Sequence, residues 1–207
     1  MEDLPYWILL VAIWVAMIGL ILRDLNRRKW TKVQRWEDFA TEMGFSIDSN
    51  DRGVVLAGEK HGRDLEVEFW SEIVGRKAAA GRNGKIYYYV TIEVELHDQG
   101  WDGEVIYSVK SGGLDAGAEI LLDMEMDERF QAGIDLPDRI KNTLLHPPIK
   151  QRLMEIADAC DSRNESLAIN NHRLKLTHQG QPDREEIQRL IDDCCDLAIE
   201  LDERAAK

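Results

Sequence analysis

The side chains that most often carry out chemistry are scattered along this chain and form no recognised motif. Its five histidines lie in or beside turns and show no HExxH or HxH ligand pattern. The chain also lacks a P-loop, a dinucleotide-binding glycine triplet, a GxSxG elbow and a kinase signature. The sequence therefore predicts no catalytic residue, no metal site and no cofactor, and we expect surface histidines: His61, His97, His146, His172 and His178.

The three cysteines, Cys160, Cys194 and Cys195, make an odd number without the spacing of a disulfide framework. Such usage is typical of a reducing compartment. The adjacent pair could bind a metal or act in redox chemistry, but no further cysteine or histidine stands at ligand spacing around it. Because Cys194 also falls on the apolar stripe of a predicted helix, we expect it in the core.

Residues 123–128 (DMEMDE) are the densest group of carboxylates. They lack the glycine and the distant glutamate of a calcium loop, and their alternation with methionine is typical of a strand with one solvated face. The main functional hypothesis is a binding or scaffolding module. The alternative is a membrane-tethered enzyme using scattered carboxylates such as Asp123 or Glu125.

Two clusters of basic residues stand out in a chain of net charge −13. Either cluster could contact anionic lipid or an acidic partner, at about 1 kcal/mol per basic residue near such a surface. Simpler roles are topology determination for the first and a solvated hairpin tip for the second. The candidates are Arg23, Arg27, Arg28, Lys29 and Lys32 in the first cluster, and Arg76, Lys77, Arg82 and Lys85 in the second.

Residues 4–22 (LPYWILLVAIWVAMIGLIL) form an uncharged run of nineteen residues. As a helix this run is about 28 Å long, close to the apolar thickness of a bilayer, and predicts a single transmembrane helix. Acidic residues precede it and the first basic cluster follows it. The positive-inside rule then places the amino terminus outside and the rest in the cytoplasm of a bacterium, with the span in the inner (plasma) membrane.

The span also carries a stripe of small residues, Ala12, Ala16 and Gly19, on one helical face. Such a stripe lets a second helix approach closely in lipid and makes a homo-oligomer possible. The expected partners are therefore the lipid bilayer, an unidentified protein and, through this stripe, a second copy. The acidic charge disfavours nucleic acid.

The remaining pattern predicts an α+β fold: one mainly antiparallel sheet covered by a long carboxy-terminal helix. We expect an anchor with its basic cluster over residues 1–30 and one cytoplasmic domain over 31–207. Periodicity predicts helices over 32–43, 136–146, 149–160 and 182–201. It predicts strands over 53–58, 65–70, 85–96, 105–109, 120–127, 166–169 and 173–177.

The order of these features resembles a group of bacterial single-pass membrane-anchored proteins with a domain of unknown function. The resemblance rests on the span, a linker helix ending in residues 43–45 (MGF), a glycine-bounded strand over 53–58, and the block 127–133 (DERFQAG) before a leucine-rich helix. It implies membrane anchoring and no activity. The sheet with its closing helix is also similar to pleckstrin-homology-like domains, in which case residues 137–160 would be an insertion.

Overall fold

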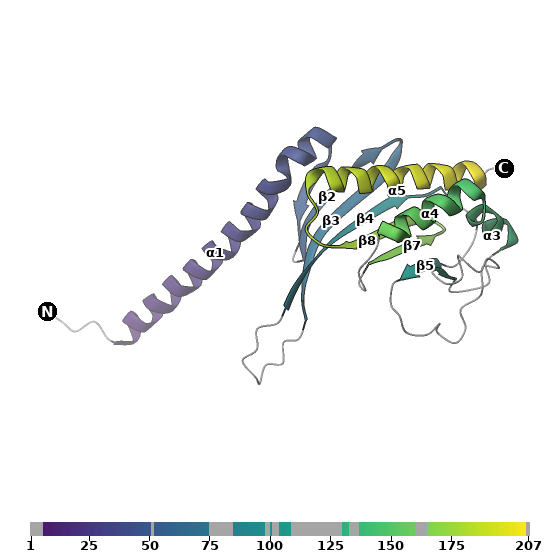
Figure 1. Cartoon of the computed structure of the whole chain (residues 1–207). Helices are drawn as coiled ribbons and strands as arrows, with labels where there is room; N and C mark the ends of the chain where they lie inside the picture. The colour runs from purple at the N-terminus through teal and green to yellow at the C-terminus, as the bar shows by residue number, and fades with distance from the viewer. Residues whose placement is uncertain are drawn as a thin grey trace.

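The computed structural model describes residues 6–50, 52–74, 85–97, 100, 104–108, 130–132, 137–159 and 165–205, with the side chains of α1 described at 11, 13–20 and 34–43. These residues form an α+β fold in which helices lie against a sheet (Figure 1). The helices are α1 (Tyr6–Met43), α3 (Asp138–Leu144), α4 (Pro147–Ala159) and α5 (Arg184–Ala205). The strands are β1 (Ser46–Ser49), β2 (Gly53–Lys60), β3 (Arg63–Val74), β4 (Lys85–Glu95), β5 (Glu104–Ser108), β6 (Phe130–Ala132), β7 (Ser166–Asn170) and β8 (Arg173–Gln179).

All described strands belong to one antiparallel sheet, in the order β1-β2-β3-β4-β8-β7-β5-β6. The first four strands are consecutive neighbours. His61 and Gly62 both have positive φ, which matches the right-handed twist of a two-residue hairpin between β2 and β3. At the β7–β8 turn, the side chain of Asn170 accepts the backbone N–H groups of His172 and Arg173. The predicted antiparallel sheet is confirmed.

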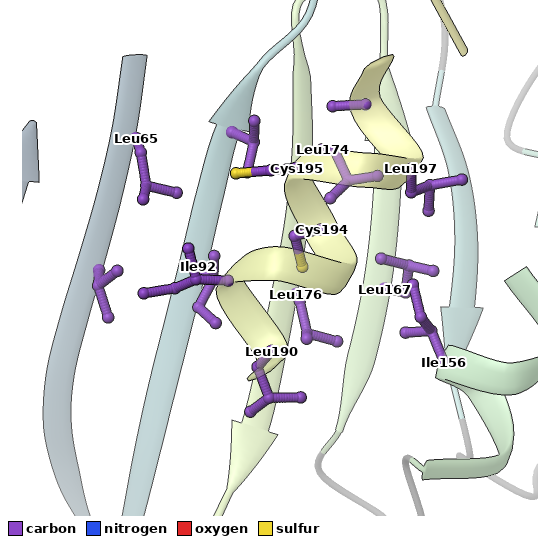
Figure 2. Close-up of a cluster of buried hydrophobic side chains, with 14 of the residues drawn as sticks. Leu65, Ile92, Ile156, Leu167, Leu174, Leu176, Leu190, Cys194, Cys195 and Leu197 are labelled. Atoms are coloured by element: carbon purple, nitrogen blue, oxygen red, sulfur yellow. The ribbon is translucent and has the colours of Figure 1, made fainter. Parts of the chain in front are cut away.

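Helix α5 covers one face of this sheet and forms the centre of the core (Figures 1 and 2). Asp183 caps its first turn by accepting the N–H of Glu186 at 2.9 Å. Figure 2 shows the apolar side of α5 over the strands, with Cys194 among buried leucines. The covering helix is therefore as predicted. Its buried residues are Ile187, Leu190, Ile191, Cys194, Cys195, Leu197, Ala198 and Leu201.

Helices α3 and α4 belong to the same core. Ile140 and Leu144 of α3, and Ile149 and Leu153 of α4, are at most 4% exposed and pack with the residues of α5 and the sheet. Each fully buried side chain of this size contributes about 1.5–3 kcal/mol. The segment 137–160 is consequently part of the fold, whereas a pleckstrin-homology-like arrangement would require it as an insertion.

Helix α1 is longer than the sequence pattern predicts. The pattern indicates a separate helix over 32–43, but the structure has one helix from Tyr6 to Met43. No proline or glycine interrupts residues 20–43, so nothing in the chain stops the helix there. It ends at Gly44, whose φ is 72°, with Phe45 N–H donating to the Ala40 carbonyl in a Schellman motif.

Two short strands were not predicted, and one predicted strand cannot be compared. β1 and β6 have four and three residues, too few for an alternating pattern to be distinctive. The strand expected over 120–127 lies outside the described residues. Among the residues that are described, no helix is both long enough and apolar enough to cross a membrane.

A buried ion pair joins the end of α5 to the sheet. The Arg63 guanidinium of β3 contacts the Asp202 carboxylate of α5, and both side chains are only 8% exposed. Arg63 also donates to the Glu95 carbonyl at 3.2 Å, and Nδ1 of His97 lies 2.6 Å from the same carboxylate oxygen of Asp202. The Asp202 carboxylate of α5 therefore contacts both Arg63 of β3 and His97, which follows β4.

We expect Asp202→Ala to lower the free energy of unfolding by about 3–5 kcal/mol, because it leaves the Arg63 guanidinium buried without its partner. Asp196→Ala is the matched control, since Asp196 lies on the same helix, is half exposed, and is 3.6 Å from Arg152. That change should cost less than about 1 kcal/mol. Urea unfolding followed by circular dichroism measures both, and equal midpoints for the two variants would contradict the assignment.

Candidate binding site

A pocket of about 120 Å³ lies where the end of α1 meets the sheet. Its walls come from three parts of the chain: the last turns of α1, the neighbouring strands β2, β3 and β4, and the segment before α5. Most of the lining is apolar or aromatic. The lining residues are Arg35, Trp36, Val54, Phe69, Trp70, Ser71, Tyr88, Tyr89, Val90, Gly180, Gln181 and Pro182.

The wall nearest α1 is built by aromatic contacts. The rings of Trp36 and Phe69 stack with centroids 4.1 Å apart and planes 15° apart, and Phe39 meets Trp36 edge to face at 5.9 Å. Offset stacked and edge-to-face pairs stabilise by about 0.5–1.5 kcal/mol beyond their buried area. These contacts fix both the end of α1 and the shape of the pocket.

Two glycines of β2 are packed closely against their neighbours. A Cβ atom at Gly53 would lie 1.6 Å from the carbonyl oxygen of Phe69, and a Cβ at Gly58 would lie 2.1 Å from the Phe45 ring. Gly53 and Gly58, which bound the strand predicted from the sequence, are therefore required by the close approach of β3 and of Phe45.

The segment before α5 closes another side of the pocket. The N–H of Gly180 donates to the carbonyl of Tyr88 at 2.9 Å, and Pro182 is buried. Arg184 then reaches α1, where it donates to the Arg35 carbonyl at 3.3 Å and lies 3.6 Å from the Asp38 carboxylate. The pocket is consequently held by contacts between its walls.

The pocket lining includes the positively charged Arg35, although the net charge of the protein is −13. The guanidinium of Arg35 lies 5.2 Å from the centroid of the Trp36 ring and is exposed. It forms no ion pair with any residue that the structure describes. An apolar cavity with one unpaired cation at its rim suits a ligand that has an apolar body and an anionic group.

A second aromatic pair lies on neighbouring positions of the same strands. Trp70 stacks on Tyr89 with ring centroids 4.2 Å apart, and its indole N–H donates to the Thr91 hydroxyl at 3.0 Å. Burial, followed by the nearby Glu72 carboxylate, raises the pKa of Tyr89, so this hydroxyl stays neutral in the physiological range.

The side chains of most of the basic residues singled out in the sequence lie outside the part of the structure that is described. Arg23, Arg27, Arg28, Lys29 and Lys32 lie on α1, with side chains that are outside the description. Arg76, Lys77 and Arg82 also lie outside it. Lys85 begins β4, is exposed, and places its ammonium group 4.8 Å from the Tyr87 ring. The role of both clusters stays a prediction.

Sequence reasoning missed the pocket and placed one histidine wrongly. Trp36 and Phe39 read as an ordinary apolar stripe, and no local pattern joins them to Phe69 or Tyr88. His178 was expected at the surface but is 18% exposed, with Nδ1 2.8 Å from the buried carboxylate of Glu165. The available signal was its spacing from Leu174 and Leu176, which places His178 on the same face of β8.

The remaining candidates for chemistry are the cysteines and the carboxylates. Cys194 and Cys195 are fully buried in the core. The described residues contain no cluster of histidine, cysteine and carboxylate that could hold a metal. Asp123 and Glu125, which the alternative enzyme hypothesis names, lie outside the described residues.

Comparison with known proteins adds a fold relationship. No protein-family model matches the chain, and no curated protein matches its sequence. A solved structure, that of the mycobacterial trehalose monomycolate transport factor A, TtfA, is similar with a TM-score of 0.52. The match covers 83% of this chain and 92% of that one at 11% identity. At this identity the similarity shows a shared α+β fold, and the resemblance to bacterial anchored proteins with a domain of unknown function stays a prediction.

The buried thiols give a pH-dependent prediction. Burial raises the pKa of Cys195 from its ordinary value of about 9 to about 11, so the unfolded state releases this proton first. The resulting stabilisation is present below about pH 9 and is lost as the pH rises toward 11. In a Cys160→Ser background, neither remaining thiol should react with Ellman's reagent at pH 8 until urea unfolds the chain.

The matched control is the same background carrying Cys195→Ala. Its free energy of unfolding should fall less between pH 9 and pH 11, because this titration has been removed. Rapid reaction of two thiols in the native protein, or identical pH profiles for the two variants, would contradict the buried position.

Proposed function

We propose that this protein is a membrane-anchored binding module whose domain acts beside the bilayer on the cytoplasmic side. The observation that carries the proposal is the first part of α1. Its large apolar side chains are exposed, including Trp14 at 58%, Val15 at 64% and Leu20 at 64%. Figure 1 shows this part of α1 extending away from the sheet.

A helix that is apolar all round needs an apolar environment on all sides. Successive residues turn by 100°, so the exposed large apolar side chains cover roughly 220° of the circumference, and the small residues Ala16 and Gly19 lie on the remaining arc. The large residues are Val11, Ile13, Trp14, Val15, Met17, Ile18 and Leu20. A single protein partner covers one side of a helix, whereas lipid covers all sides. A bilayer is therefore the surrounding that this segment fits best, as the sequence hypothesis of a single transmembrane helix requires.

The direction of insertion follows from charge. Arg23, Arg27, Arg28 and Lys29 come after the apolar segment, and their excess supports a cytoplasmic domain in the inner (plasma) membrane of a bacterium, with the amino terminus outside. A partner protein near this membrane, and self-association through Ala12, Ala16 and Gly19, belong to the same proposal.

The binding part of the proposal rests on the pocket at the end of α1. It combines an apolar cavity, a stacked aromatic wall and a cation that has no ion-pair partner among the described residues, the arrangement expected of a small binding site. The structural neighbour is named a transport factor, and a role in binding is in keeping with that name.

Membrane anchoring predicts that full-length protein stays in the membrane pellet after extraction with alkaline carbonate. Val15→Glu with Ile18→Glu should release it, since each charge at the centre of a bilayer costs about 2.5–3.5 kcal/mol. The control is Gln34→Glu with Thr41→Glu, which adds the same charge at exposed positions near the other end of α1. Release of the unaltered protein, or equal retention of both variants, would overturn the anchor.

Protease treatment of the same membranes tests the orientation. The domain should be digested in inverted vesicles and protected in intact spheroplasts. Digestion in spheroplasts alone would place the domain on the outer side.

A further inference from the structure

The pocket at the end of α1 continues into an apolar strip on the sheet. We propose that pocket and strip together bind the acyl chain of a membrane lipid that carries an anionic headgroup. This inference rests on the membrane anchoring proposed above, and it names the class of ligand for the binding site.

The strip runs along one face of strand β4. Val90, Tyr88 and Ile86 alternate with residues of the opposite face, and their partners in β3 are Phe69, Ser71 and Ile73. We call Val90, Tyr88 and Ile86 the hairpin strip. At about 3.4 Å per residue the strip is roughly 14 Å long; Val90 and Tyr88 also line the pocket, and Ile86 lies roughly 7 Å beyond Tyr88. Val90 is buried under the pocket, whereas Tyr88 is 42% and Ile86 49% exposed.

The size of the pocket fits part of a chain. A cavity of roughly 150 Å³ can hold a benzene molecule, so one of about 120 Å³ holds a few carbon atoms. The rest of an acyl chain would then lie along Tyr88 and Ile86, covering side chains that are otherwise exposed to water. A linear apolar ligand uses both features, whereas a compact one would use only the pocket.

Charge complementarity indicates the headgroup. Arg35 is an exposed cation without an ion-pair partner among the described residues, in a chain of net charge −13. The guanidinium group binds phosphate and carboxylate through paired N–H donors, and the repulsion between such anions and the acidic surface elsewhere makes this position selective. An anionic lipid would place its headgroup at Arg35 and cover the hairpin strip with its acyl chain.

The position of the site favours a lipid from the bilayer. In Figure 1, the end of β3, the beginning of β4 and the amino-terminal part of α1 all point toward the lower left of the view. The hairpin strip therefore leads from the pocket toward the side on which the anchor leaves the domain. A lipid can lie with its headgroup at Arg35 and its chain directed back along the strip.

Photo-crosslinking of the full-length protein in nanodiscs of phosphatidylcholine and phosphatidylglycerol tests the proposal. Tyr88→p-benzoylphenylalanine places a photoreactive ring on the hairpin strip, and Tyr87→p-benzoylphenylalanine places it on the opposite face of the same strand. We expect a phosphatidylglycerol adduct at position 88 in mass spectrometry, at a yield about tenfold above that at position 87. Adding Arg35→Gln should lower that yield about tenfold, which corresponds to about 1.4 kcal/mol.

The other outcomes of the crosslinking experiment distinguish failure of the lipid site from failure of the anchor. Equal adduct yields at positions 88 and 87, or a yield unaffected by Arg35→Gln, would overturn the proposal. An adduct with a polypeptide at position 88, including a second copy of the chain, would also overturn it and would identify a protein surface instead. If the protein enters nanodiscs but gives no lipid adduct, only this inference fails. If it does not enter them, the membrane anchor itself fails.

Discussion

The packing of the last turns of α1 against the sheet is the interaction on which this account depends. Trp36 lies between Arg35 and the Phe69 ring of β3, while Phe39 and Ala40 enter the core beside it. Because α1 is one uninterrupted helix, these contacts also fix the direction in which its exposed apolar segment leaves the domain. The same contacts form the pocket. The fold, the pocket and the direction of the apolar part of α1 therefore all depend on a few aromatic side chains.

The two faces of the sheet differ in character: one belongs to the apolar core and the other carries paired charges. One face packs against α5, α3 and α4 through buried aliphatic side chains. On the other, Glu93 pairs with Lys175 at 2.6 Å and with Arg173 at 2.8 Å. Partial burial acts to raise the pKa of Glu93, but these two hydrogen-bonded cations outweigh it and hold the pKa below its usual value. On this face, ion pairs therefore connect strands β4 and β8.

Much of this fold could be predicted because its signals are local. Alternation identified β3, β4 and β5, short segments bounded by turn signals identified β2, β7 and β8, and a period of 3.6 residues identified α5. The continuity of α1 was also readable, since no glycine or proline interrupts residues 20–43, but the change from an apolar to an amphipathic pattern suggested a break. The pocket could not be predicted. Its walls come from separate segments spread between Arg35 and Pro182, and Trp36 and Phe69 have the same pattern as ordinary core residues.

The most direct test is a double-mutant cycle between Trp36 and Phe69, using Trp36→Leu, Phe69→Leu and the combined variant of the full-length protein. Urea unfolding gives the free energy of each. We predict a coupling energy of about 0.5–1.5 kcal/mol, because the stacked pair contributes beyond the burial of each ring alone. Strictly additive effects would show that the two rings do not interact and would contradict the docking of α1 on the sheet.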